Sequence, residues 1–137
     1  MTLAIGDLRP DEVEAAVALW EACGLTRPWN DPRADIALAL GKQASTVLAG
    51  RVDGQVVATA MTGSDGHRGW VYYLAVAPDR QRHGYGAQMM LAAADWLKAR
   101  GAPKLHVMIR SENLGVAAFY AKLGYEKSDT ITMAKRL

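Results

Sequence analysis

The chain has 137 residues, of which 50% are hydrophobic and 22% charged, as expected for one soluble globular domain. Its formal net charge is only +2, and the 16 Lys and Arg side chains are spread along the chain, which argues against a nucleic-acid partner. Cys23 is the single cysteine, and no apolar run approaches the roughly 20 residues of a membrane span, so neither an internal disulfide nor a membrane partner is expected. Residues 1–5 lack the basic segment and apolar core of a secretory signal, so we expect a cytoplasmic location.

Blocks of strand and helix pattern then alternate along the chain. Pro10 and the acidic residues after it open a first helix, the dipeptide Asp53-Gly54 predicts a tight hairpin, and Pro78 ends a strand. The expected elements are strand 3–8, a helix opening at 9–12 and ended by Gly24, helix 33–42, strands 46–52, 55–62 and 69–76, helix 84–100, strand 104–109, helix 114–123 and strand 127–135.

The resulting order, β-α-α-β-β-β-α-β-α-β, places antiparallel hairpins on both sides of a β-α-β unit. We therefore predict an α/β (α+β) fold in which a mixed central sheet carries helices on both faces. No repeat, linker or low-complexity segment divides the chain, so residues 1–137 are expected to form one domain.

The segment most indicative of chemistry is residues 74–87, LAVAPDRQRHGYGA, where a strand ends and a basic loop with two glycines opens a long helix. Glycine allows close approach of the backbone to a ligand, and the unpaired first amides of a helix form an anion site suited to a pyrophosphate. Basic side chains at Arg80, Arg82 or His83 would add charge pairing. The alternative is that the two glycines only turn the chain.

Two other nucleotide-binding motifs do not match these residues. A Walker loop requires a Lys after its last glycine, which is absent after Gly86. A dinucleotide fingerprint requires a third glycine where Met89 stands, so an NAD-type dehydrogenase is excluded.

Two separated motifs instead resemble the signatures of the GNAT N-acetyltransferase family. Gln81-x-x-Gly84-x-Gly86 is similar to the family's Gln/Arg-x-x-Gly-x-Gly/Ala motif. Residues 113–125, NLGVAAFYAKLGY, are similar to its second motif, an Asn, a Tyr seven residues later and then Leu-Gly-Phe/Tyr. Residues 27–32 and 65–69 further resemble the small bacterial YpeA-type members.

The resemblance implies transfer of an acetyl group from acetyl-CoA, as co-substrate, to a primary amine by direct attack in a ternary complex. The acceptor is either a small-molecule amine or a peptide or protein amine, and the oligomeric state stays open, a homodimer included. No metal site is expected.

The alternative function is a non-catalytic acyl-CoA-binding or regulatory module. The resemblance assigns donor binding to Leu74, Ala75, Val76, Gln81, Arg82, His83, Gly84, Tyr85, Gly86, Ala87, Asn113 and Tyr120.

Tyr120 is the residue to which the resemblance assigns catalysis. Attack of an amine on a thioester forms an oxyanion and then expels a thiolate, so a phenol beside the sulfur could donate the proton that the leaving group needs. A backbone amide near Val76 could stabilise the oxyanion. The alternative is that Tyr120 packs in the core.

The general base and the acceptor site are less clearly marked. Strand 70–74 contains no acid, which departs from the better-known family pattern, and Asp65 and His67 at its entrance are the nearest titratable groups. They could equally be turn residues. The loop with Arg27, Trp29 and Asn30 is expected on the acceptor side of the sheet, the alternative for Trp29 being an anchor of that loop to the core.

Overall fold

The computed structural model describes residues 3–137, so Met1 and Thr2, part of the segment examined for a secretory signal, lie outside the described residues. One five-stranded sheet runs in the order β1-β2-β3-β4-β5, antiparallel from β1 to β4 and parallel between β4 and β5. The elements are β1 (Ala4–Asp7), α1 (Val13–Ala22), α2 (Pro32–Ala39), β2 (Ser45–Val52), β3 (Gln55–Ser64), β4 (Gly69–Val76), α3 (Tyr85–Lys98), β5 (Leu105–Val107) and α4 (Leu114–Lys122), with 3-10 turns at Pro10–Glu12 and Pro78–Arg80.

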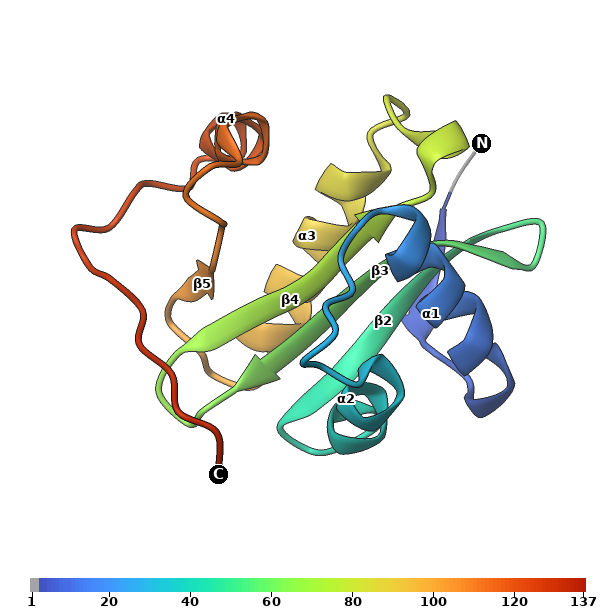
Figure 1. The fold of residues 1–137 in the computed structure, drawn as a ribbon, viewed down its shortest axis with the longest axis horizontal. Coiled ribbons are helices and arrows are strands. Elements are labelled where there is room, and N and C mark those ends of the chain that lie inside the picture. The colour runs from blue at the N-terminus through green and yellow to red at the C-terminus, as the bar shows by residue number, and fades with distance from the viewer. Residues whose placement is uncertain (1–2) are drawn as a thin grey trace.

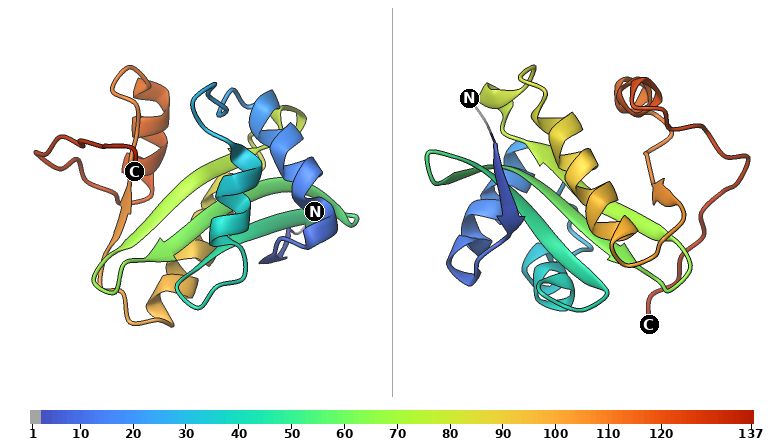
Figure 2. Two further views of the ribbon diagram at one scale, coloured as in Figure 1. Left: turned by 60° about the horizontal axis from the view of Figure 1, so that its bottom comes forward. Right: turned by 180° about the vertical axis from the view of Figure 1, so that it is seen from behind.

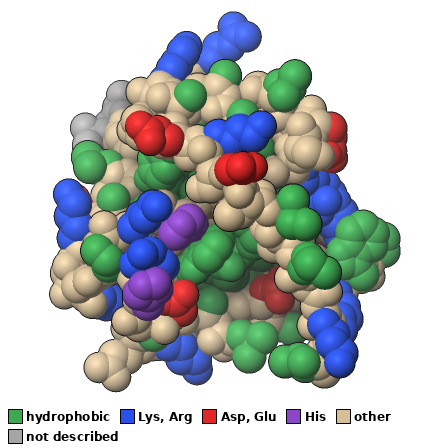
Figure 3. All heavy atoms as spheres, turned by 90° about the vertical axis from the view of Figure 1, so that its left-hand side faces the viewer, with side chains coloured by type: hydrophobic (Ala, Val, Ile, Leu, Met, Phe, Trp, Pro, Cys, Tyr) green, Lys and Arg blue, Asp and Glu red, His purple; other side chains and the backbone are tan. Residues whose placement is uncertain are grey.

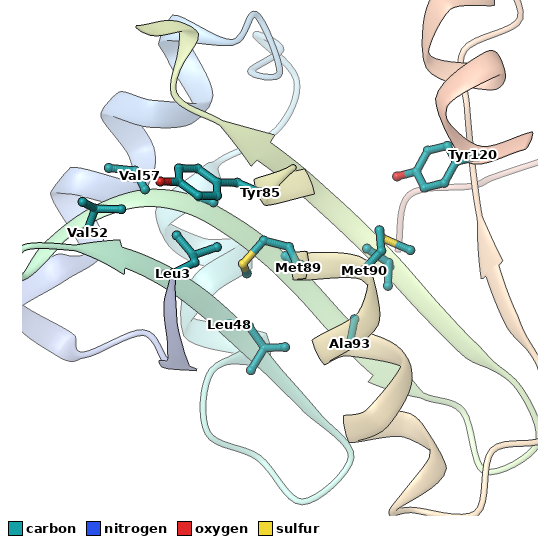
Figure 4. Close-up of a cluster of buried hydrophobic side chains, with 12 residues drawn as sticks. Leu3, Leu48, Val52, Val57, Tyr85, Met89, Met90, Ala93 and Tyr120 are labelled. Atoms are coloured by element: carbon teal, nitrogen blue, oxygen red, sulfur yellow. The ribbon is translucent and has the colours of Figure 1, made fainter. Parts of the chain in front are cut away.

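Helices cover both faces of the sheet. Helices α1 and α2 lie on one face, α3 lies on the other, and α4 stands beyond β5 (Figures 1 and 2). Two buried clusters follow from this arrangement, one around Trp20 and Ile36 and the other around Met89 and Met90 (Figure 4). The predicted α/β class, with a mixed sheet between helices, is confirmed. No helix within residues 3–137 combines the length and hydrophobicity needed to cross a membrane.

The turn between β2 and β3 has the geometry that its sequence predicts. Asp53 and Gly54 both adopt positive φ, 51° and 77°, which a two-residue type I′ hairpin requires. Aspartate tolerates this region better than most residues and glycine enters it without strain, so the dipeptide sets the register of the hairpin.

The predicted strand over residues 127–135 is wrong, because this segment contains no strand in the structure. Its alternating pattern favours a strand, yet Ile131 and Met133 are each 87% exposed. A β-rich segment becomes a strand only by pairing with another strand, and the C-terminal tail, residues 125–137, instead reaches back to the loop after α1, where Arg136 contacts Trp29 and Asn30.

A buried ion pair ties the start of α1 to the sheet. The Glu12 carboxylate accepts two hydrogen bonds from the Arg51 guanidinium, at 2.8 and 2.5 Å, and a third from the Arg9 N–H at 2.8 Å. The two side chains of the pair are only 10% and 12% exposed. The bonds from Arg51 therefore lower the pKa of Glu12 to about 2 despite its burial.

We expect Glu12→Gln to lower the free energy of unfolding at pH 7 by about 2–4 kcal/mol, because it leaves the Arg51 charge buried without a partner. In the wild type, this contribution is complete above pH about 4.5 and is lost as the pH falls toward 2, since the folded-state pKa lies below the unfolded one. The free energy of unfolding, measured with urea between pH 2 and 7, should therefore depend less on pH in the variant than in the wild type. Glu14→Gln, which breaks an exposed pair with Arg33, is the control and should change stability far less.

Candidate active site

A cleft of about 770 Å³ lies between α2 with its preceding loop and the walls formed by β4, the residues after β5, and α4. Tyr72, Tyr73 and Leu74 line it from β4, and Asn113, Val116 and Tyr120 line it from the α4 side. On the side of the molecule where α4 and the C-terminal tail lie, hydrophobic side chains fill a central recess with Lys and Arg side chains on both sides of it (Figure 3). Such a recess is the usual setting of a small-molecule site.

One wall of the cleft is an unpaired strand edge. Strand β4 pairs with β5 only from Gly69 to Val71. Strand β5 ends there, and the chain that follows it runs away from β4 toward α4 (Figure 1). Within the described residues, no strand occupies the β5 side of residues 72–76, which include Leu74, Ala75 and Val76. An exposed strand edge presents N–H and C=O groups to which an extended, amide-containing ligand can add as a further strand.

The loop after β4 delivers the chain to the N-terminus of α3. Gly84 caps this helix in the left-handed conformation, with φ 77°, and Arg82 also has a positive φ of 68°. Two side chains hold the loop in place. The Gln81 Nε2 donates to the Val76 carbonyl at 3.2 Å, and the His83 Nδ1 lies 2.9 Å from the Arg80 carbonyl.

The start of α3 therefore lies beside the open end of β4. The first turn of a helix leaves its N–H groups without intrahelical partners, and its dipole favours an anion. Residues 82–87, which include Tyr85, Gly86 and Ala87, supply this turn and the loop before it. The guanidinium of Arg82 is exposed there, which suits charge pairing with a phosphate.

Gly86 has a packing role that its motif does not reveal. A Cβ at this position would lie 3.2 and 3.3 Å from two ring carbons of Phe119. The glycine therefore lets α3 and α4 approach each other closely, in addition to any approach by a ligand.

Tyr120 projects from α4 toward the buried cluster on the α3 side of the sheet, where Figure 4 shows its hydroxyl directed toward the sheet. Its ring packs edge-to-face against Phe119 and Tyr125. The side chain is 6% exposed and lines the cleft, and its hydroxyl has no hydrogen-bond partner among residues 3–137. Burial and the neighbouring Tyr125 raise the pKa of Tyr120 to about 12, so the phenol keeps its proton at neutral pH.

Asn113 also lines the cleft and caps α4. Its Oδ1 accepts a hydrogen bond from the Val116 N–H at 3.3 Å, which satisfies one of the unpaired donors at the start of that helix. This hydrogen bond fixes the start of α4, and the binding of the donor by Asn113 stays a prediction.

The acceptor-side candidates fall into two groups. Arg27 and Asn30 line the cleft, but Trp29 is 60% exposed and is neither a lining residue nor an anchor in the core. Asp65 and His67 lie in the exposed turn between β3 and β4 and are not among the residues that line the cleft. The Asp65 carboxylate accepts the N–H groups of His67 and Arg68, at 2.8 and 2.6 Å, and so caps its own turn.

Sequence reasoning missed most of the cleft wall, including Tyr73 and Asp35, which contact each other. Tyr73 and Leu74 together oppose the single residue Ala60 of β3, so β4 contains a bulge, and Tyr73 has a φ of 52°. The bulge directs the Tyr73 ring onto Trp20, with ring centroids 3.7 Å apart, and its hydroxyl donates to Asp35 at 2.7 Å. No local signal in the sequence marks a contact between residues 38 positions apart.

The comparison with known families agrees with this geometry. The sequence profile described as "Acetyltransferase (GNAT) family" matches residues 8–125, a span that includes both signatures and every residue that lines the cleft. The chain belongs to the GNAT family of acetyltransferases. The GNAT resemblance noted in the sequence is thereby confirmed; the likeness to YpeA-type members remains a prediction.

Relatives of this GNAT acetyltransferase match it almost end to end. An acetyltransferase of Pectobacterium atrosepticum is 45% identical over 129 residues, covering 94% of this chain and 92% of the relative. An N-acetyltransferase of Yersinia pestis is 44% identical over 127 residues, covering 93% and 90%. The chain is therefore an enzyme, an acetyltransferase.

Solved structures show the same fold at low identity. The enzyme AAC(6')-Iy, in complex with the bisubstrate analogue CoA-S-monomethyl-acetylneamine, superposes with a TM-score of 0.83 at 16% identity, covering 100% of this chain and 99% of that one. The ribosomal-protein-S18-alanine N-acetyltransferase from Escherichia coli gives 0.78 at 23% identity, covering 93% and 79%. The acceptors named for these two enzymes differ, so the fold leaves the acceptor of this GNAT enzyme open.

Proposed function

We propose that this enzyme transfers an acetyl group from acetyl-CoA to a primary amine by direct attack within a ternary complex. The observation that carries the proposal is the unpaired edge of β4 beside the N-terminus of α3, with Tyr120 on the opposite wall of the same cleft. The β4 edge is complementary to an extended amide chain, the α3 N-terminus to an anion, and Tyr120 to the sulfur of a thioester.

The residues divide the binding of the donor between them. The backbone from Leu74 to Val76 pairs with the pantetheine arm, and the amides of residues 82–87 hold the pyrophosphate with help from the Arg82 guanidinium. The side chains of Gln81 and His83 keep this loop in shape through their contacts with backbone carbonyls. The amine enters from the side of the cleft lined by Arg27 and Asn30.

The chemical step forms a bond between the amine nitrogen and the acyl carbon and breaks the bond between that carbon and sulfur. A backbone amide near Val76 stabilises the oxyanion of the tetrahedral intermediate. Tyr120, which its raised pKa keeps protonated, donates its proton to the departing thiolate. An acceptor that enters as an ammonium loses one proton to solvent before it attacks, and the nitrogen loses a second proton to solvent as the amide forms. Solvent then returns a proton to the Tyr120 phenolate.

Cys23 is the one thiol near this site, so an acyl-enzyme route must be weighed. Its Sγ donates to the Val76 carbonyl at 3.3 Å, and burial raises the pKa of the thiol, which makes it a poor nucleophile. We expect Cys23→Ala to keep kcat within about threefold of wild type, because direct attack does not use the thiol. A near-complete loss of turnover, together with an acetylated Cys23 in the mass spectrum of the wild type, would establish the acyl-enzyme route instead.

The decisive experiment incubates the protein with acetyl-CoA and a broad panel of amines and peptides while free thiol release is followed. Turnover that depends on one class of amine, with the acetylated product identified by mass spectrometry, is the expected result. Tight binding of acetyl-CoA with no turnover across the panel would contradict the proposal and favour a non-catalytic binding module.

A further inference from the structure

The cleft contains one carboxylate to which the steps above assign no role, that of Asp35 on α2. Its Oδ2 accepts the hydrogen bond from the Tyr73 hydroxyl at 2.7 Å. Its Oδ1 accepts no hydrogen bond from any of residues 3–137, so one oxygen is left for a ligand. A half-buried carboxylate in a cleft wall is costly to leave without a donor, which makes a bound hydrogen-bond donor favourable there.

The position of this carboxylate is fixed by groups from three elements. The Trp20 Nε1 donates to Thr59 Oγ1 at 2.8 Å, and that hydroxyl donates to the Tyr73 carbonyl at 2.9 Å. The Tyr73 ring stacks on Trp20, and burial with the bond to Asp35 raises the pKa of the Tyr73 phenol, which keeps it a donor. Asp35 is thereby held in one orientation before any ligand arrives.

The surface around Asp35 is apolar but in contact with water. Leu38 is 76% exposed, Met108 47%, Tyr72 42% and Val116 36%, and all four line the cleft. Exposed hydrophobic side chains gathered in one cleft favour a ligand with an apolar body.

The charges of the lining restrict the ligand further. Asp35 is the only acidic residue among those that line the cleft within residues 3–137, whereas Arg27 and Arg110 line it with positive charge. The Arg27 guanidinium is engaged with the carbonyls of Gly24 and Thr26, both at 2.8 Å, and remains a full charge. A ligand with several ammonium groups would be repelled by the positive charges of Arg27 and Arg110. A ligand with one ammonium group could pair that group with the Asp35 carboxylate.

We propose that the acceptor is an amine with a single ammonium group on an apolar body, and that Asp35 binds this ammonium as the amine enters the cleft. The inference rests on the proposed function and names its substrate class. The apolar body lies against Leu38, Met108 and Val116. Tyr73 acts as the positioning residue for the carboxylate.

The test compares binding of phenethylamine with that of phenethyl alcohol, which has nearly the same shape without the charge, by calorimetry on CoA-saturated protein. The wild type should bind the amine at least about tenfold more tightly, as expected for a charge-assisted hydrogen bond. Asp35→Asn should remove this preference, and Tyr73→Phe should reduce it. Asp95→Asn, an equal charge change at an exposed position on α3, should leave it intact.

Turnover provides the second arm. Phenethylamine should give a higher kcat/KM than neamine, which carries several ammonium groups, and Asp35→Asn should raise the KM of the amine while the KM of acetyl-CoA stays unchanged. An unaltered amine preference in Asp35→Asn, or a better rate with neamine, would overturn the inference while the acetyl-transfer proposal stands. The amine preference without turnover of any amine in the broad panel would support the binding role of Asp35 and contradict the proposed function.

Discussion

Tyr120→Phe is expected to lower kcat at least about tenfold while acetyl-CoA binding and thermal stability change little. The expectation follows if Tyr120 protonates the leaving thiolate, because a positioned general acid contributes about 10²- to 10⁴-fold in rate. The substitution keeps the edge-to-face contacts of the ring with Phe119 and Tyr125. It removes only a hydroxyl that has no hydrogen-bond partner among residues 3–137, so the free energy of unfolding should change little.

Two controls separate proton donation from positioning. An acyl donor whose thiol has a lower pKa needs less proton donation, so the variant should lose less rate with it; a positioning defect would slow both donors equally. In the wild type, the pKa of about 12 predicts no fall in kcat from deprotonation of Tyr120 between pH 7 and 10. If Tyr120→Phe retains full kcat under conditions where chemistry limits turnover, Tyr120 is a packing residue.

Gly86→Glu is expected to abolish the stabilisation that acetyl-CoA gives to the wild type. A ligand that binds only the folded state adds RT ln(1 + [L]/Kd), about 2.7 kcal/mol at 100 times Kd, which should raise Tm by roughly 10 °C for a domain of this size. A carboxylate at the first turn of α3 would repel the pyrophosphate that we place there. Thermal shift with and without acetyl-CoA measures the effect.

The contact between Gly86 and Phe119 makes a packing control necessary. Because any Cβ at Gly86 would press on the Phe119 ring at 3.2–3.3 Å, part of the effect of Gly86→Glu is a loss of stability without ligand. Gly86→Ala adds the same Cβ without the charge and should lower the Tm of the free protein while retaining most of the ligand-induced shift. A full shift in Gly86→Glu would place the phosphate site elsewhere.

Local sequence patterns were sufficient to predict several elements and turns of the fold and part of the candidate site. The expected strand 69–76 coincides with β4, and the Asp53-Gly54 turn adopts the predicted positive φ values. The glycine-bearing loop does lead into the N-terminus of α3, and Tyr120 does line the cleft. These features are predictable because each depends on residues close together in sequence, through turn conformation, helix capping and hydrophobic periodicity.

Other features could not be predicted from the sequence, because they depend on contacts between segments that are distant along the chain. The bond between Tyr73 and Asp35 joins β4 to α2, and the bulge that allows it appears in the pairing of β4 with β3 rather than in either sequence. The close approach of Phe119 to Gly86, which leaves little room for a Cβ, likewise exists only once α3 and α4 are packed together. Residues 127–135 carry a strand pattern but no strand, because β structure requires a partner edge, which only the folded chain can supply.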